Sequence, residues 1–197
     1  ITTKHEDDQF SQVTLLHAPG NGYKKAKANG ETLTDTTQIS YSSTFTLSKP
    51  TNSITLGNIN ADSEFWGAYV TNNQHGVIFN SIGNNGACYS HYNKIANFAE
   101  QTTLMQPQLI IISLGTNEAF AKFSDDELYN HINALVTELK KHNPNAQFLL
   151  TTPMECDRRT RYRYRGRRRY KFATNTKCLK VRDAIVNYGT KHNIAVW

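Results

Sequence analysis

The fold is constrained most by two short runs rich in apolar residues, Leu-Ile-Ile-Ile-Ser at 109–113 and Gln-Phe-Leu-Leu-Thr-Thr at 147–152. A continuously apolar run of this length is typical of a strand buried on both faces of a parallel sheet. Between the two runs, Ser124–Glu127 has the sequence of a capping box and predicts the start of a helix. One apolar stripe at helical spacing follows, formed by Leu128, Ile132, Leu135, Val136 and Leu139.

This alternation of strands and helices extends over residues 76–197. Further strands are predicted at 76–80 and 194–197, and further helices at 92–105 and 177–193. The order predicts an α/β fold, in which a parallel sheet lies between two layers of helices as a three-layer core. Crossovers in such a sheet are right-handed, and ligands bind beyond the carboxyl ends of its strands.

Residues 10–71 show a different pattern, rich in Thr, Val, Ile, Tyr and Phe, and they predict strands at 12–18, 37–47, 52–59 and 65–71. Turn signals separate these runs: Asn21-Gly22, Asn29-Gly30, Lys49-Pro50 and Gly57-Asn58. We therefore expect residues 1–75 to form a β-rich, sandwich-like accessory domain and residues 76–197 to form the α/β core.

The net charge of +6 is concentrated in one segment. Residues 158–171 hold eight Arg and one Lys with no acidic residue, so the rest of the chain carries a net charge of −3. No apolar run reaches the length of a membrane span. The three cysteines, Cys88, Cys156 and Cys178, lack the paired spacing of a metal site, and we expect free thiols and no metal.

Two loops rich in glycine and asparagine follow predicted strands. They are Ser-Ile-Gly-Asn-Asn-Gly-Ala at 81–87 and Leu-Gly-Thr-Asn-Glu-Ala-Phe at 114–120. Gly86 can bring its backbone N–H close to a ligand, and Asn117 can offer a side-chain N–H. Two neutral donors that converge on one point suit the oxyanion of acyl transfer. The alternative is that these residues only form turns, which both residue types favour.

Together, these two blocks resemble the second and third conserved blocks of the SGNH (GDSL-like) esterase family, and the longer run through 147–153 is similar to its peptidoglycan and carbohydrate O-acetylesterases. The resemblance implies that Gly86 and Asn117 are oxyanion donors and that Gly115 shapes the loop presenting Asn117. Glu118 stands where the family has an acid, and we expect it to cap or orient the loop. Residues 1–75 lie where some members carry an inserted β-rich domain. No cofactor is implied.

The family's nucleophile lies in a Gly-Asp-Ser turn, and this chain contains no such turn. Asp62-Ser63 lacks the preceding apolar strand, so we interpret it as structural. Ser90-His91 is a weaker candidate for a catalytic pair than for a capping Ser and a surface His. We therefore expect the nucleophilic Ser and the base His to lie outside these 197 residues. A degenerate relative that only binds its ligand is the alternative.

Two further features are candidates for substrate binding. Arg167, Arg168 and Arg169 belong to the Arg- and Tyr-rich segment, which suits an anionic glycan, a mobile basic loop or, less well, nucleic acid. Trp66, with Tyr69 and Tyr23, either forms a sugar-stacking face or, as aromatic residues more often do, belongs to the core.

The sequence thus predicts an esterase that removes acyl groups from O-acetylated polysaccharide or peptidoglycan, outside the cytoplasm of a bacterium. A non-catalytic carbohydrate-binding protein is the first alternative, and a nucleic-acid-binding module is the second. The sequence does not determine the oligomeric state.

Overall fold

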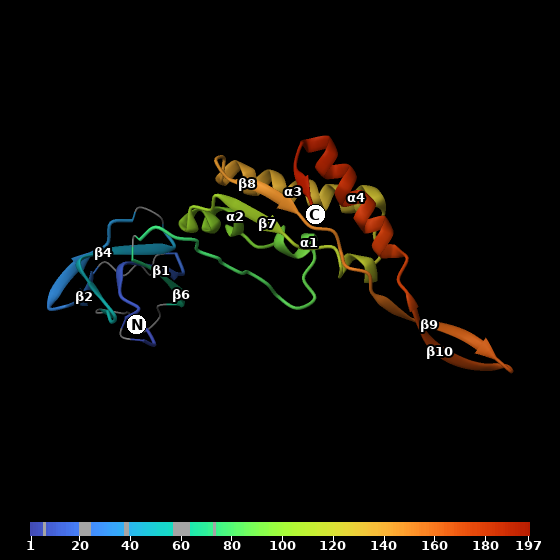
Figure 1. Ribbon diagram of the computed structural model, residues 1–197, viewed down its shortest axis with the longest axis horizontal. Coiled ribbons are helices and arrows are strands. Elements are labelled where there is room, and N and C mark those ends of the chain that lie inside the picture. The colour runs from blue at the N-terminus through green and yellow to red at the C-terminus, as the bar shows by residue number, and fades with distance from the viewer. Residues whose placement is uncertain (6, 20–24, 38–39, 57–63, 73) are drawn as a thin grey trace. The chain divides into compact units, whose positions relative to one another are not determined.

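The computed structural model describes residues 1–5, 7–19, 25–37, 40–56, 64–72 and 74–197 (Figure 1). The chain forms two compact units, Ile1–Asn80 and Ser81–Trp197. The division falls five residues later than the sequence analysis placed it. Residues 76–80, which were predicted to be a strand of the α/β core, form no strand, and the side chains of Val77, Ile78 and Phe79 are exposed.

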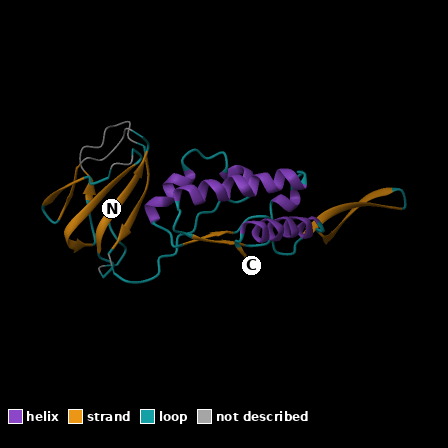
Figure 2. Ribbon diagram, turned by 90° about the horizontal axis from the view of Figure 1, so that it is seen from above, coloured by secondary structure: helices purple, strands orange, loops and turns teal. Residues whose placement is uncertain are grey.

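The first unit contains two three-stranded antiparallel sheets (Figure 2). One has the order β4-β1-β6, with β4 at Ser42–Thr51, β1 at Phe10–His17 and β6 at Phe65–Thr71. The other has the order β3-β2-β5, with β3 at Glu31–Thr34, β2 at Lys25–Ala28 and β5 at Thr55–Leu56.

Of the four turns predicted in this unit, one is confirmed, one is wrong and two lie outside the described residues. Asn29 and Gly30 both have positive φ, 51° and 78°, and join β2 to β3 as such a pair does in a tight hairpin. The turn predicted at Lys49-Pro50 is wrong, because β4 continues through it. Pro50 is tolerated there because β4 is an edge strand of its sheet and its pairing with β1 is irregular in this region. Asn21-Gly22 and Gly57-Asn58 lie outside the described residues.

Both sheets contribute side chains to one buried cluster: Phe10, Val13, Leu15, Ala26, Ala28, Leu33, Phe45, Leu47 and Ile54. The predicted β-rich character of the first unit is therefore confirmed by its strands and core. The finer expectation, that the two sheets form a sandwich and serve as an accessory domain, stays a prediction.

The second unit contains a parallel sheet of order β11-β8-β7, with β7 at Leu109–Ile112, β8 at Gln147–Leu150 and β11 at Ala195–Val196. Helix α3 at Asp125–His142 connects β7 to β8, and α4 at Lys177–His192 precedes β11. The capping box is confirmed, since the Glu127 N–H donates to Ser124 Oγ at 3.2 Å and the Ser124 N–H donates to Glu127 Oε2 at 2.8 Å.

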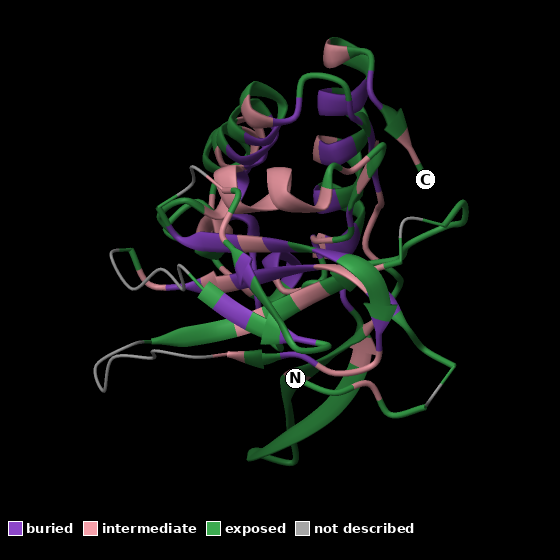
Figure 3. Cartoon of the chain, turned by 90° about the vertical axis from the view of Figure 1, so that its left-hand side faces the viewer, coloured by how far each residue is buried: buried purple, intermediate pink, exposed green. Residues whose placement is uncertain are grey.

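The helices cover one face of this sheet. The chain moves in one direction across it, from β7 to β8 to β11, so two right-handed crossovers place α3 and α4 on the same side. Ile112, Phe148 and Leu150 face the buried cluster of these helices, whereas Leu109 and Ile111 on the other face are 51% and 47% exposed. Within Ser81–Trp197 the sheet and its helices form two layers, so the predictions of a three-layer core and of a β7 buried on both faces are wrong for this unit. Figure 3 shows buried and exposed segments alternating along the helices of this unit.

The predicted helix at 92–105 is interrupted. Helix α1 spans Tyr89–Tyr92, α2 spans Phe98–Thr102 and a 3-10 turn, η1, spans Thr103–Met105. Asn97 separates α1 from α2 because its φ of 62° is left-handed, a conformation that a continuous helix does not allow. None of the described helices combines the length and apolar character that crossing a membrane requires.

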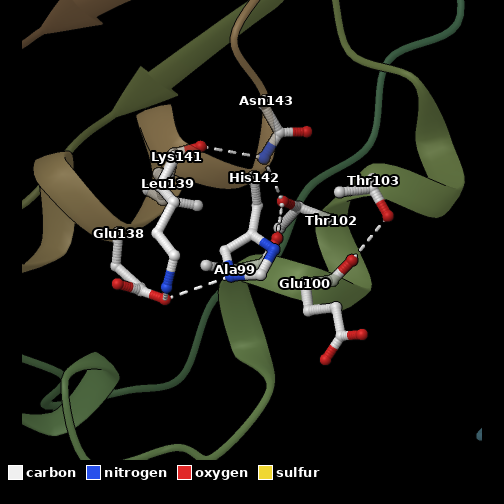
Figure 4. Close-up of polar contacts among 9 residues, drawn as sticks. All are labelled: Ala99, Glu100, Thr102, Thr103, Glu138, Leu139, Lys141, His142 and Asn143. Atoms are coloured by element: carbon white, nitrogen blue, oxygen red, sulfur yellow. Dashed lines mark hydrogen bonds and ion pairs between the residues drawn. The ribbon is translucent and has the colours of Figure 1, made fainter.

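Polar contacts fasten α2 to the end of α3 (Figure 4). Asn143, which is buried and follows α3, donates from Nδ2 to Thr102 Oγ1 at 2.8 Å. On the exposed side of α3, hydrogen bonds from Lys141 and then His142 lower the pKa of Glu138. Because Asn143 precedes β8, this network lies at the amino edge of the sheet, opposite the edge where ligands bind.

The Arg-rich segment forms a hairpin that the sequence analysis did not predict. Strand β9 at Asp157–Tyr164 pairs with β10 at Arg167–Thr174, and Figure 1 shows the hairpin extending away from the helices of this unit. Arg165 and Gly166 join the strands with positive φ values of 47° and 75°, the backbone conformation of a tight two-residue turn.

Candidate active site

The first glycine-rich loop ends in a tight turn. The Ala87 N–H donates to Asn84 O at 3.1 Å, and Gly86 between them has a φ of 80°. This conformation favours glycine, which has no Cβ to clash with the neighbouring carbonyl. The turn leaves Gly86 exposed, two residues before the N-cap residue Cys88 of α1.

The second loop leaves the carboxyl end of β7. Gly115 is buried with a φ of 124°, and a Cβ built there would lie 3.1 Å from Val181 Cγ1, 3.2 Å from Ile185 Cδ1 and 3.2 Å from Pro153 Cδ. Only a residue without a side chain fits this position without strain. The chain then enters a 3-10 turn, η2 at Glu118–Phe120, for which Asn117 is the N-cap residue.

The Asn117 amide joins the two loops. Its Nδ2 donates to Ala87 O at 2.8 Å, so the side chain lies beside the residue that follows Gly86. An amide nitrogen carries two N–H groups, and contacts with the described residues occupy one of them. The structure therefore brings the two predicted oxyanion donors, Gly86 and Asn117, into neighbouring positions.

Glu118 fixes the same junction from inside the protein. It is only 2% exposed, and its Oε1 accepts the backbone N–H of Tyr89 at 2.7 Å, at the N-terminus of α1. Glu118 thereby caps the N-terminus of α1 and orients its own loop, as we expected from the sequence. Burial, and secondarily the charge of Glu118, raises the pKa of the Cys88 thiol to about 11, so this thiol remains protonated at neutral pH.

Two residues at the start of α4 hold the loop from its other side. Asn175 is buried and donates from Nδ2 to Ala119 O at 3.0 Å, and Lys177 Nζ donates to Ala121 O at 2.9 Å. Neither positioning residue was predicted from the sequence. An Asn two residues before a predicted helix signals a helix start, but it does not identify a partner 56 residues away.

The serines and histidines near this junction form no catalytic pair. His91 accepts the Cys88 N–H at Nδ1, 3.0 Å away, and no hydrogen bond within the described residues links it to Ser90. The interpretation of Ser90 as a cap is wrong, because Ser90 lies inside α1 and Cys88 is the N-cap residue. Asp62-Ser63 lies outside the described residues.

One Ser–His contact occurs in the first unit. His17 Nε2 and Ser43 Oγ lie 3.0 Å apart, and both residues are buried, at 1% and 0% exposure. Because no substrate reaches a fully buried hydroxyl in a strand, the pair has a structural role. Among the residues that the structure describes, no group of three or more His, Cys, Asp or Glu side chains is arranged as metal ligands.

The remaining candidates lie on exposed strands. Arg167, Arg168 and Arg169 are exposed on β10, and no hydrogen bond or ion pair of the described residues joins them to the two loops. Trp66 on β6 is 46% exposed and donates from Nε1 to Glu64 Oε1 at 2.9 Å, so the alternative that it belongs to the core is wrong. Tyr69 is half-buried, and Tyr23 lies outside the described residues.

Residues 52–193 match the model of the GDSL-like Lipase/Acylhydrolase family, and the chain belongs to this family. No curated protein matches the chain. Among solved structures, it is similar over its whole length to one titled "Peptidoglycan O-acetylesterase in action, 5 min", with a TM-score of 0.70 and 18% identity. The chain spans about half of that protein, 52%.

A second structure, titled as a possible lipase from Chitinophaga pinensis DSM 2588, is 19% identical with a TM-score of 0.36, over 56% of this chain and 48% of that one. The family match and the first structure confirm the resemblance predicted from the two loops.

Proposed function

We propose that the chain is part of an esterase whose oxyanion hole is formed by the Gly86 backbone N–H and the Asn117 side-chain amide. The observation that carries this proposal is the 2.8 Å hydrogen bond from Asn117 Nδ2 to Ala87 O, which holds the Asn117 amide beside the residue that follows Gly86. Family membership supports the reaction class.

In this reaction a serine hydroxyl attacks the carbonyl carbon of an ester while a histidine accepts the hydroxyl proton. The carbonyl oxygen gains negative charge in the tetrahedral intermediate, and Gly86 and Asn117 donate hydrogen bonds to it. The alcohol leaves with a proton from the histidine, and water then releases the acid from the serine by the same steps in reverse order. Glu118 and Asn175 act indirectly, by holding the loops in place.

The nucleophilic serine and the base histidine come, in this proposal, from outside these 197 residues. Within the described residues, the one hydrogen-bonded Ser–His pair, Ser43–His17, is buried in the other unit.

The proposed substrate is an O-acetylated polysaccharide or peptidoglycan, which the protein would meet outside the bacterial cytoplasm. The similar solved structure is titled as a peptidoglycan O-acetylesterase, which supports a glycan ester. The half-exposed indole of Trp66 is of the type that stacks on sugar rings, and the Trp66→Ala variant is expected to bind glycan more weakly while its unfolding midpoint stays unchanged.

The test measures acetate release from an aryl acetate and from acetylated peptidoglycan. It uses the 197-residue chain and, in parallel, the product of the longest open reading frame that contains it. We expect release by the longer product only. Release by the 197-residue chain would refute an external nucleophile, and glycan binding without release by either protein would favour a non-catalytic carbohydrate-binding relative.

A further inference from the structure

The β9–β10 hairpin carries cations on both of its faces. Cross-strand partners share a face, so the register divides the side chains into two sets. One face has the cations Arg158, Arg167, Arg169 and Lys171. The other face has the cations Arg159, Arg161, Arg163 and Arg168, and Arg165 lies in the turn. The hairpin therefore presents nine cations and lacks an apolar face.

Nothing within the hairpin neutralises this charge. Asp157 is its single acidic residue, and none of the ion pairs formed by the described residues involves a hairpin cation. Arg163 and Arg168 are directly opposite each other, an arrangement of like charges that destabilises strand pairing. An isolated two-stranded hairpin is only marginally stable in water, and repulsion among cations without acidic partners lowers its stability further. We infer that these cations are present because they bind an anionic partner.

The aromatic side chains of the hairpin already contact its own cations. The guanidinium of Arg159 lies 4.0 Å from the ring centroid of Tyr170, and that of Arg165 lies 5.4 Å from the ring of Tyr164. Lys171 Nζ lies 6.0 Å from the ring centroid of Tyr162. Three of the four aromatic rings thus orient cations instead of being left free to stack on bases.

The spacing of the cations suits a polymer with regularly repeated anions. Alternate residues of one strand lie about 7 Å apart on the same face. This spacing is comparable to that between successive phosphates of an extended phosphodiester chain. Guanidinium groups bind phosphate oxygens through paired hydrogen bonds, which favours phosphate as the repeated group.

A hollow of about 410 Å³ continues this surface at the base of the hairpin. Its lining includes Arg158, Arg159, Arg161 and Lys177 together with the polar residues Thr174 and Asn175. Cationic side chains therefore extend from the exposed strands to the N-terminus of α4.

We propose that the β9–β10 hairpin is a binding arm for a polyol phosphate polymer, a phosphodiester chain without bases, which it recognises through the phosphates. The polymer would anchor the protein near its substrate, but the binding itself does not depend on the esterase activity. Nucleic acid carries the same phosphodiester groups. We expect its bases to add no affinity, so that nucleic acid binds no more tightly than the polyol phosphate polymer.

The test measures the binding of a labelled glycerol phosphate oligomer by fluorescence anisotropy at several salt concentrations. The oligomer has about twelve phosphates, a number within the range of sites that bind single-stranded nucleic acid. An oligothymidylate with the same number of phosphates is the comparison. The variant Arg167→Gln/Arg168→Gln/Arg169→Gln removes three charges of the hairpin. The control Lys94→Gln/Lys140→Gln/Lys191→Gln removes three exposed charges elsewhere in the same unit, away from the hollow at the start of α4.

We expect the hairpin variant to bind the glycerol phosphate oligomer at least tenfold more weakly, and the slope of log affinity against log salt to fall by about 2, as loss of three phosphate contacts predicts. The control should remain within about twofold of the unmodified protein, since its lysines lie outside the arm. Equal weakening in both variants would mean non-specific attraction and would overturn the proposal. Tenfold tighter binding of the oligothymidylate would also overturn it, because base stacking would then contribute.

Discussion

The Gly115→Ala variant tests whether the loop that presents Asn117 requires glycine. At a φ of 124°, an alanine would occupy a region that is nearly exclusive to glycine, at a cost of about 1–3 kcal/mol. The new methyl group would also lie 3.1–3.2 Å from three carbon atoms of Val181, Ile185 and Pro153. Overpacking of this kind costs about 1–3 kcal/mol, so we expect the unfolding free energy to fall by about 2–6 kcal/mol in total.

The control is Gly83→Ala, in the other glycine-rich loop. A Cβ at Gly83 meets nothing within 4 Å, and its φ lies outside the left-handed range. Alanine there is expected to leave stability unchanged or to raise it by about 0.4–1 kcal/mol, because it restricts the unfolded chain.

Urea unfolding followed by far-UV circular dichroism is the assay. The described helices all lie in Ser81–Trp197, so the helical signal reports the unit that contains Gly115. If Gly115→Ala shifted the midpoint no more than Gly83→Ala does, the loop would tolerate a side chain, and the reasoning that only glycine fits there would be refuted.

The remaining predictions concern stability and thiol chemistry. Asn143→Ala should lower the unfolding free energy by about 1–3 kcal/mol in urea titrations, because it removes a buried side chain that bridges α2 and α3. Glu138→Gln should produce a smaller change in the same titrations. Because its folded-state pKa is lowered, the contribution of Glu138 is present above its unfolded pKa, near 4.5, and is lost as the pH falls through its folded value. The Sγ atoms of Cys156 and Cys178 lie 3.3 Å apart, so oxidised glutathione should join them in a disulfide while it is itself reduced to two thiols. Peptide mass spectrometry would detect this disulfide, and a Cys156 that stays reduced would contradict the prediction. Cys88 should react with a thiol reagent at pH 8 only after urea is added. Because folding raises the pKa of its thiol from 9.0 to about 11, the unfolding free energy should decrease as the pH rises from about 9 toward 11.

Local patterns predicted the elements that depend on neighbouring residues. The capping box at Ser124 and the stripe of apolar residues after it determined α3, because caps and helical periodicity act over a few residues. The apolar run at 109–113 predicted β7 for the same reason. The two loops were recognised because glycine and asparagine occur where the backbone must be left-handed or expose an amide.

The features that were missed depend on tertiary structure. The prediction that β7 is buried on both faces was wrong. The order of the strands decides which face of the sheet the helices cover, and the apolar run does not encode that order. The strand predicted at 76–80 did not form because apolar residues become a strand only when another strand pairs with them. The Asn175–Ala119 contact could not be predicted, since it joins residues 56 positions apart.

The central claim is tested most directly by the effect of Asn117→Ala on the hydrolysis of an aryl acetate. The protein is the product of the longest open reading frame that contains this chain, and the matched control is Asn130→Ala, which replaces an exposed Asn on α3. Loss of one oxyanion-hole donor should lower kcat by about 10²–10³-fold with little change in KM, while the control retains full activity. A wild-type kcat in a folded Asn117→Ala variant would contradict the account.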